Sequence, residues 1–115
     1  FWECRKRLAE LYIKGKNYDK AATILDQLTA SRNDQLAAFA INARGDIFLA
    51  TEKKRDAVLM YLRTTLLMPK ENRERPKALL KVANLLKEMN DNRAANFANM
   101  LRTDYPDNSL IKELK

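Results

Sequence analysis

The chain has 115 residues, a length that suggests one domain, and 46% of its residues are hydrophobic while 32% are charged. This composition is too apolar for a disordered chain, and two glycines and three prolines are too few for a turn-rich all-β fold. No apolar run approaches the roughly 18–20 residues of a membrane span, and the sequence has no histidine and no glycine-rich phosphate loop, so we expect no enzyme, metal or cofactor.

The net charge is +7, from 22 Lys and Arg against 15 Asp and Glu, which could favour a nucleic acid as partner. Candidate phosphate contacts are the basic run 53–55 together with Arg73, Arg75, Lys77 and Lys81. Each of these groups adjoins acidic residues and lacks interleaved aromatic residues for base stacking. We therefore interpret them as solvated turns and treat nucleic-acid binding as an alternative that the sequence disfavours.

The spacing of apolar residues predicts six helices. They span residues 2–14, 18–29, 35–51, 56–68, 77–89 and 93–104, and a short helix follows over 108–115. Cys4 has no partner for an internal disulfide and is expected to be partly buried on the first helix. Gly15 suits a left-handed cap at the end of that helix, and residues 70–76 form a charged link.

The middle of the chain carries small, aromatic and proline residues at a recognisable spacing. These are Gly45 and Phe48 on one helix, Ala57 and Tyr61 on the next, and Pro69 at the end of the pair. This order resembles the tetratricopeptide repeat, with Ile41 and Arg44 in place of its first Trp and Leu.

The same pattern recurs in phase on both sides of the central pair. Before it stand Leu8, Ala9, Tyr12 and Ala21, and after it stand Val82, Ala83, Leu86, Ala94 and the closing Pro106. We place three repeats at about residues 2–33, 35–69 and 76–106. The resemblance implies an all-α fold, a right-handed α-solenoid of three stacked antiparallel helix pairs with a short C-terminal capping helix. The small residues would then sit where helices approach closely, and the aromatic residues would pack in the core.

In this family the first helix of each pair lines a concave groove. The residues expected to face it are Lys6, Glu10, Ile13, Phe39, Asn42, Asp46, Leu49, Lys77, Leu80, Asn84 and Lys87. The resemblance implies a protein or peptide partner, and the amides of Asn42 and Asn84 could bond its backbone. One subfamily clamps a carboxylate, but its sites fall here on Lys6, Glu10, Ala43, Lys77 and Lys81, so both of its asparagines are lost.

The main expectation is therefore a non-catalytic interaction module. A structural segment of a larger solenoid is the alternative, and self-association is left open. Because the chain starts with Phe1, we expect it to be part of a longer protein. The closing Tyr105–Asp107 resembles the ends of repeats in bacterial envelope proteins, which favours the periplasm over the cytoplasm only weakly.

Overall fold

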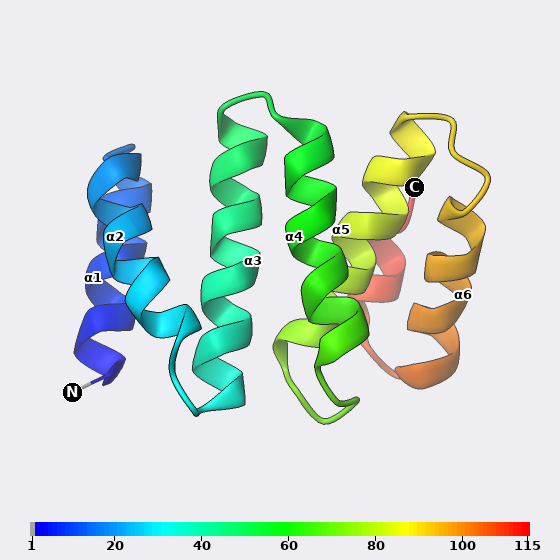
Figure 1. Ribbon diagram of the computed structural model, residues 1–115. Helices are drawn as coiled ribbons and strands as arrows, with labels where there is room; N and C mark the ends of the chain where they lie inside the picture. The colour runs from blue at the N-terminus through cyan, green and yellow to red at the C-terminus, as the bar shows by residue number, and fades with distance from the viewer. Residues whose placement is uncertain (1) are drawn as a thin grey trace.

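The computed structural model describes residues 2–115, and this part of the chain is helical without any strand. Figure 1 shows six α-helices and one 3₁₀-helix following one another along the chain. They are α1 (Trp2–Lys14), α2 (Tyr18–Thr29), α3 (Asp34–Ala50), α4 (Lys54–Leu67), α5 (Glu74–Glu88), α6 (Ala94–Asp104) and η1 (Ser109–Glu113). The predicted all-α class and the six helices are confirmed.

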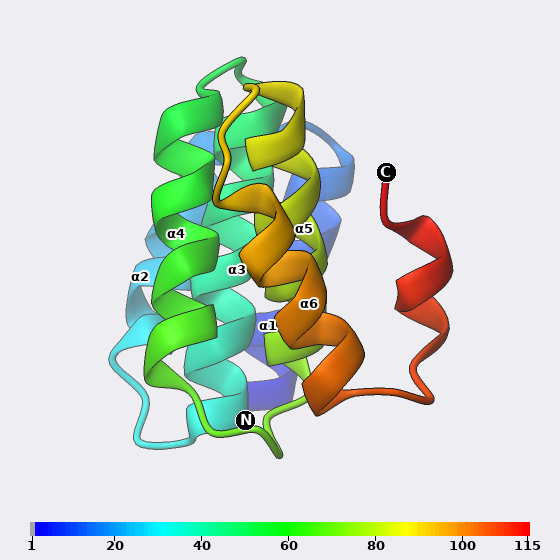
Figure 2. The same cartoon turned by 90° about the vertical axis from the view of Figure 1, so that its right-hand side faces the viewer.

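The helices form hairpins that stack into an α-solenoid. Each helix packs against the next, and α1, α3, α5 and η1 also contact one another in succession. In Figures 1 and 2, α2 and α4 lie on one side of the molecule and η1 lies on the other side, while α6 packs against α5 at the end of the stack. We call the side of α1, α3, α5 and η1 the inner face, and the side of α2, α4 and α6 the outer face. No helix in the described residues is long and apolar enough to cross a membrane.

The three hairpin turns share one backbone geometry. Lys16, Glu52 and Asn90 have positive φ angles of 61°, 63° and 56°, and no glycine in residues 2–115 does. In each turn the following N–H bonds a carbonyl five residues earlier, on Tyr12, Phe48 or Leu86, which is the Schellman closure of a helix. The prediction of a left-handed cap at Gly15 is therefore wrong by one residue, because the positive φ angle belongs to Lys16.

The small residues of the motif lie at buried contacts, as expected. Ala9, Gly45 and Ala83 are all buried, and a Cβ added to Gly45 would come within 2.7 Å of the Tyr61 ring. Gly45 is thus required because the Tyr61 side chain of α4 crosses α3 at this point.

Several motif residues differ from the expected burial. The motif residue Leu8 is 42% exposed, and Cys4, which was expected to be partly buried, is exposed. Tyr12 and Phe48 are half-buried. The sequence pattern identifies which face of a helix is apolar, but α1 has neighbours on one side only, so part of its apolar face stays open.

The link over residues 70–76 departs most from the prediction. Helix α5 begins at Glu74, so Pro76 falls in its first turn, where the missing N–H leaves no hydrogen bond unmade. Asn72, Glu74 and Arg75 are buried rather than solvated. The terminal segment also differs, because residues 109–113 form a 3₁₀-helix that is capped by Asn108.

Candidate functional site

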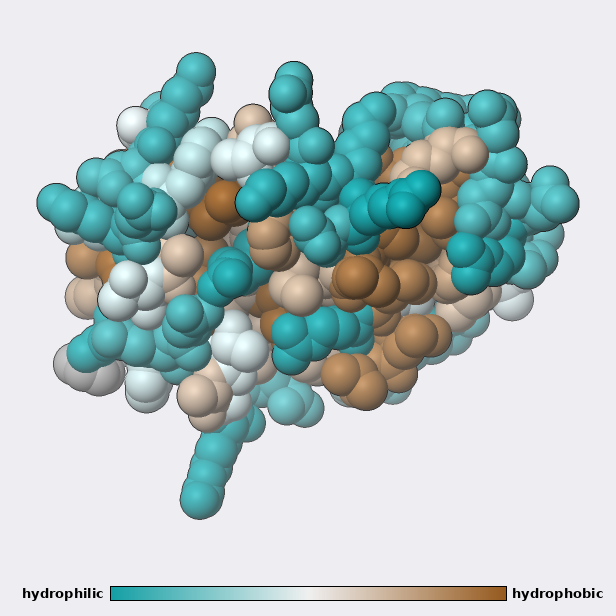
Figure 3. Space-filling model, turned by 45° about the horizontal axis from the view of Figure 1, so that its top comes forward, coloured by the Kyte–Doolittle hydropathy of each residue, from teal (hydrophilic) through white to brown (hydrophobic). Residues whose placement is uncertain are grey.

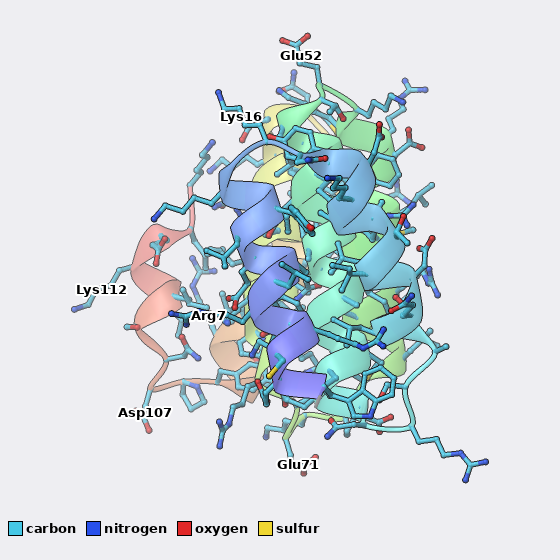
Figure 4. The ribbon with its side chains drawn as sticks, turned by 90° about the vertical axis from the view of Figure 1, so that its left-hand side faces the viewer. Arg7, Lys16, Glu52, Glu71, Asp107 and Lys112 are labelled. Atoms are coloured by element: carbon cyan, nitrogen blue, oxygen red, sulfur yellow. The ribbon has the colours of Figure 1, made fainter. Side chains whose placement is uncertain are left out.

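A cavity of about 430 Å³ opens on the inner face between α3, α4, α5 and the terminal segment. It is lined by Asn42, Asp46, Tyr61, Glu74, Lys77, Leu80, Lys81, Asn84, Leu110, Glu113 and Lys115. In Figure 4 the terminal segment, which carries Lys112, stands apart from α1 on this side of the molecule. The cavity thus has an apolar part near Leu80 and Leu110 and a charged part made by lysine and acidic side chains.

The wall from α3 and α4 is built around Gly45. The absence of a side chain at Gly45 lets the Tyr61 ring reach across α3, where its hydroxyl donates a hydrogen bond to Asp46 Oδ1. Burial raises the pKa of Tyr61 far above its usual value, and the charge of Asp46 adds to this effect. The phenol therefore stays protonated and acts as a donor.

Asp46 keeps part of its surface in solvent, but its carboxylate lies against the neighbouring helices. Desolvation raises its pKa, while the hydrogen bond from Tyr61 and the positive charge of Lys81 act in the opposite direction. Asp46 is thus a partly desolvated carboxylate at the edge of the cavity, facing the lysines of α5.

The floor of the cavity joins α3 to the start of α5. Asn42 Nδ2 donates to the backbone oxygen of Glu74 at 3.0 Å and to Glu74 Oε1 at 3.1 Å. The other oxygen of Glu74 accepts from Lys77 Nζ at 3.2 Å. Asn42 is only 6% exposed, so its amide is committed to Glu74 rather than open to a peptide.

Asn84 lines the cavity too, and its side chain bonds the backbone of the chain's own terminal segment. Its Nδ2 donates to the Glu113 carbonyl at 3.0 Å, and its Oδ1 accepts from the Lys115 N–H at 2.9 Å. Lys87 Nζ donates to the Lys115 carbonyl at 2.8 Å. One asparagine side chain therefore binds both the donor and the acceptor of an extended backbone.

The eleven predicted groove residues do not form one surface. The cavity brings together Asn42, Asp46, Lys77, Leu80 and Asn84. Lys6 and Glu10 instead border a shallow depression along α1. Ile13, Phe39 and Leu49 pack against the core, and Lys87 lies beside the end of the chain.

Sequence reasoning missed the contributions of Glu74, Lys81, Glu113 and Lys115 to this cavity. Glu74 was assigned to a charged link, because residues 70–76 carry five charged side chains and show no apolar periodicity. The terminal residues carried no signal, because their place depends on how the chain turns after Pro106.

The same region weakens the nucleic-acid alternative. Arg75 is 8% exposed, and its guanidinium donates to the Thr65 carbonyl at 3.0 Å and to Asp104 Oδ2 at 2.9 Å. It also stands 3.3 Å from the Tyr105 hydroxyl. The expectation that Arg75 is a solvated residue able to reach a phosphate is wrong.

Comparison with known proteins identifies the repeat. Models of the tetratricopeptide repeat match residues 1–44 and residues 77–108. The central stretch between them carries the motif with Gly45, Ala57 and Tyr61, and it has the same turn geometry as its neighbours. No curated protein and no solved structure gives a significant match. The two matches and the stacked helical hairpins agree, and the chain belongs to the tetratricopeptide repeat family.

Proposed function

We propose that the chain is a non-catalytic module that binds a peptide segment of a protein partner in the inner-face cavity. Tetratricopeptide repeats generally mediate protein–protein interactions and are typically non-catalytic. The observation that carries the proposal is Asn84, which bonds a backbone carbonyl and a backbone N–H beside an open cavity. A peptide entering this cavity meets the apolar side chains of Leu80 and Leu110 and charged side chains of both signs.

Two lysines supply the accessible cationic part of the site. Lys77 and Lys81 are exposed and line the cavity one turn apart on α5. Asp46 faces them from α3, and Glu74 is paired with Lys77 at the start of α5 itself. The charge of the site is therefore mixed, and we expect peptides with both acidic and basic residues to be preferred over strongly acidic ones.

The test selects ligands from a library of random displayed peptides and measures their affinity by calorimetry. We expect Lys77→Ala with Lys81→Ala to weaken binding by about tenfold or more, since both charges line the cavity. Lys16→Ala with Lys112→Ala is the matched control, because these lysines point into solvent away from the cavity (Figure 4). Equal affinities for both double variants would contradict binding at this site.

A structural role in a larger solenoid is the second candidate. It is supported by Leu8 and Leu11 on α1, which are 42% and 56% exposed and could pack against another helical pair. Stacking between copies would then appear as concentration-dependent sedimentation that Leu8→Ser with Leu11→Ser abolishes. Monomeric behaviour at all concentrations would leave peptide binding as the better account.

A further inference from the structure

The outer face has an apolar groove between α4 and α6. Both helices pack against α5 (Figures 1 and 2), and the space between them above α5 encloses about 470 Å³. Val58 and Leu86 form the buried floor, and Leu59, Leu62 and Phe97 line the walls. Figure 3 shows a hydrophobic patch on this side of the molecule.

Helix α4 carries a row of leucines on its outward face. Leu59 and Leu66 are 58% and 68% exposed, and with Leu62 they follow one another at spacings of three and four residues along one face of the helix. Single exposed leucines are common on protein surfaces, but a contiguous row beside an apolar groove marks an interaction site.

The charge at the rim of the groove is positive. Arg55 is exposed and lines the groove at the start of α4, and Arg63 is exposed one turn before Leu66. Arg93 lines the α6 side, but its guanidinium is held by Asp91 at 2.7 Å and 3.0 Å. Asp91 is thus neutralised locally, which leaves Arg55 and Arg63 to attract acidic groups.

The shape of the groove selects among partners. From Arg55 to Leu62 the groove follows about two turns of α4, or roughly 10 Å, and the exposed leucine row continues one turn further to Leu66. An extended peptide would leave backbone N–H and C=O groups against leucine side chains, whereas a helix satisfies these groups internally. Residues 2–115 also contain no strand to which a peptide strand could add.

We propose that the outer groove binds an amphipathic helix of a partner protein, with leucine-like residues on one face and acidic residues flanking them. The leucines would insert between α4 and α6, while the acidic residues would meet Arg55 and Arg63. This site lies on the face opposite the inner cavity, so it is independent of the peptide site proposed above.

The experiment titrates the 115-residue chain into a fluorescein-labelled helical peptide with leucine at every third or fourth position and glutamate on the flanks. We expect binding that weakens at least about tenfold in Leu59→Ser with Leu66→Ser and in Arg55→Glu. Leu8→Ser with Leu11→Ser is the matched control, because it removes two exposed leucines from α1. A version of the peptide with lysine on the flanks should bind more weakly than the glutamate version. Circular dichroism checks that each variant stays folded.

Several results would overturn the proposal. Equal loss with both leucine double variants would indicate nonspecific hydrophobic attachment, and equal affinity for the two peptides would remove the role of the arginines. Binding of vesicles of anionic phospholipid through Leu59 and Leu66, without peptide binding, would assign the patch to a lipid surface. A dimer that only the Leu59 and Leu66 substitutions dissociate, again without peptide binding, would assign it to a second copy of this chain.

Discussion

Gly45 is the residue at which the repeat pattern has the clearest physical reason. Its missing Cβ leaves room for the Tyr61 ring, which is 1% exposed and is anchored by the hydrogen bond to Asp46. The glycine of the motif therefore positions the aromatic residue and, through it, one wall of the inner cavity.

Gly45→Ala should destabilise the chain by about 1–2 kcal/mol. The added methyl group displaces a buried ring at a cost of about 1–3 kcal/mol, and the better helix propensity of alanine returns up to about 1 kcal/mol. Gly15→Ala is the matched control, since its nearest neighbour would be the Leu11 carbonyl at an ordinary 3.5 Å. Urea unfolding should show Gly15→Ala to be neutral or stabilising, and equal effects of the two substitutions would refute the close approach at Gly45.

Asp46→Asn should make the chain more stable at pH 7. The pKa of Asp46 is raised in the folded state, so its contribution to stability is present at low pH and is lost as the pH rises through the folded-state pKa. Asparagine removes this charge, and its side-chain oxygen can still accept the Tyr61 hydrogen bond. The groups that face this carboxylate are Tyr61, Glu74, Lys77 and Lys81.

The measurement compares urea midpoints of Asp46→Asn and the parent chain at pH 7 and near pH 4. The gain in stability should shrink at the lower pH, where Asp46 becomes neutral in the parent. Asp91→Asn is the control, and it should lower the stability at pH 7 instead of raising it, because the hydrogen bond with Arg93 lowers the pKa of Asp91 to about 2. A gain for Asp46→Asn that is constant with pH would show that desolvation of the carboxylate is not its cause.

At the scale of the elements, the apolar periodicity was sufficient to predict all six helices, because apolar residues recur at spacings of three and four along each of them. It failed at residues 70–76, where five charged side chains suggested solvent. There Asn72 Nδ2 donates to the Asp34 carbonyl at 3.1 Å, and Asn72 Oδ1 accepts from the Glu74 N–H at 3.0 Å. Polar groups can be buried when their hydrogen bonds are satisfied. A hydrogen-bond partner that is distant in sequence, such as Asp34, leaves no periodic signal in the sequence.

Arg75→Ala should cost about 2–4 kcal/mol of stability, because it leaves Asp104 and the Thr65 carbonyl without their shared donor. Asp104 keeps 29% of its side chain exposed, which places the loss below that of a fully buried ion pair. Arg73→Ala is the matched control, since Arg73 is exposed and lies two residues away. The two variants are compared by urea unfolding, and similar small effects would show that the contacts of Arg75 contribute little.

At the scale of the whole molecule, the family resemblance predicted the stacking of the hairpins but only part of the inner surface. Asp46, Lys77 and Asn84 reach the cavity because they follow the repeat spacing. Glu113 and Lys115 could not be predicted, since the last segment reaches α5 through Asn84 and through apolar contacts of Leu110, Ile111 and Leu114. The position of a residue within its repeat predicts which side of its own helix it occupies. The closure of the cavity depends instead on the path of the chain after α6.

The two ends of the stack should differ in local stability. The ion pair of Arg44 with Asp26 and the stacking of Lys6 on Phe39 tie the first hairpin to α3. The last hairpin is tied more extensively, through Asn42, Asn72 and Arg75. Hydrogen exchange followed by mass spectrometry should therefore show faster exchange in α1 and α2 than in α5. Equal protection of both ends would contradict this order.

The link over residues 70–76, with its buried polar contacts, has a mechanical consequence. Because it fastens the last two hairpins to each other, a stretching force applied to the ends of the chain would detach the first hairpin alone and then rupture the other two together. In an optical trap the extension would rise in two unequal steps, the smaller one first.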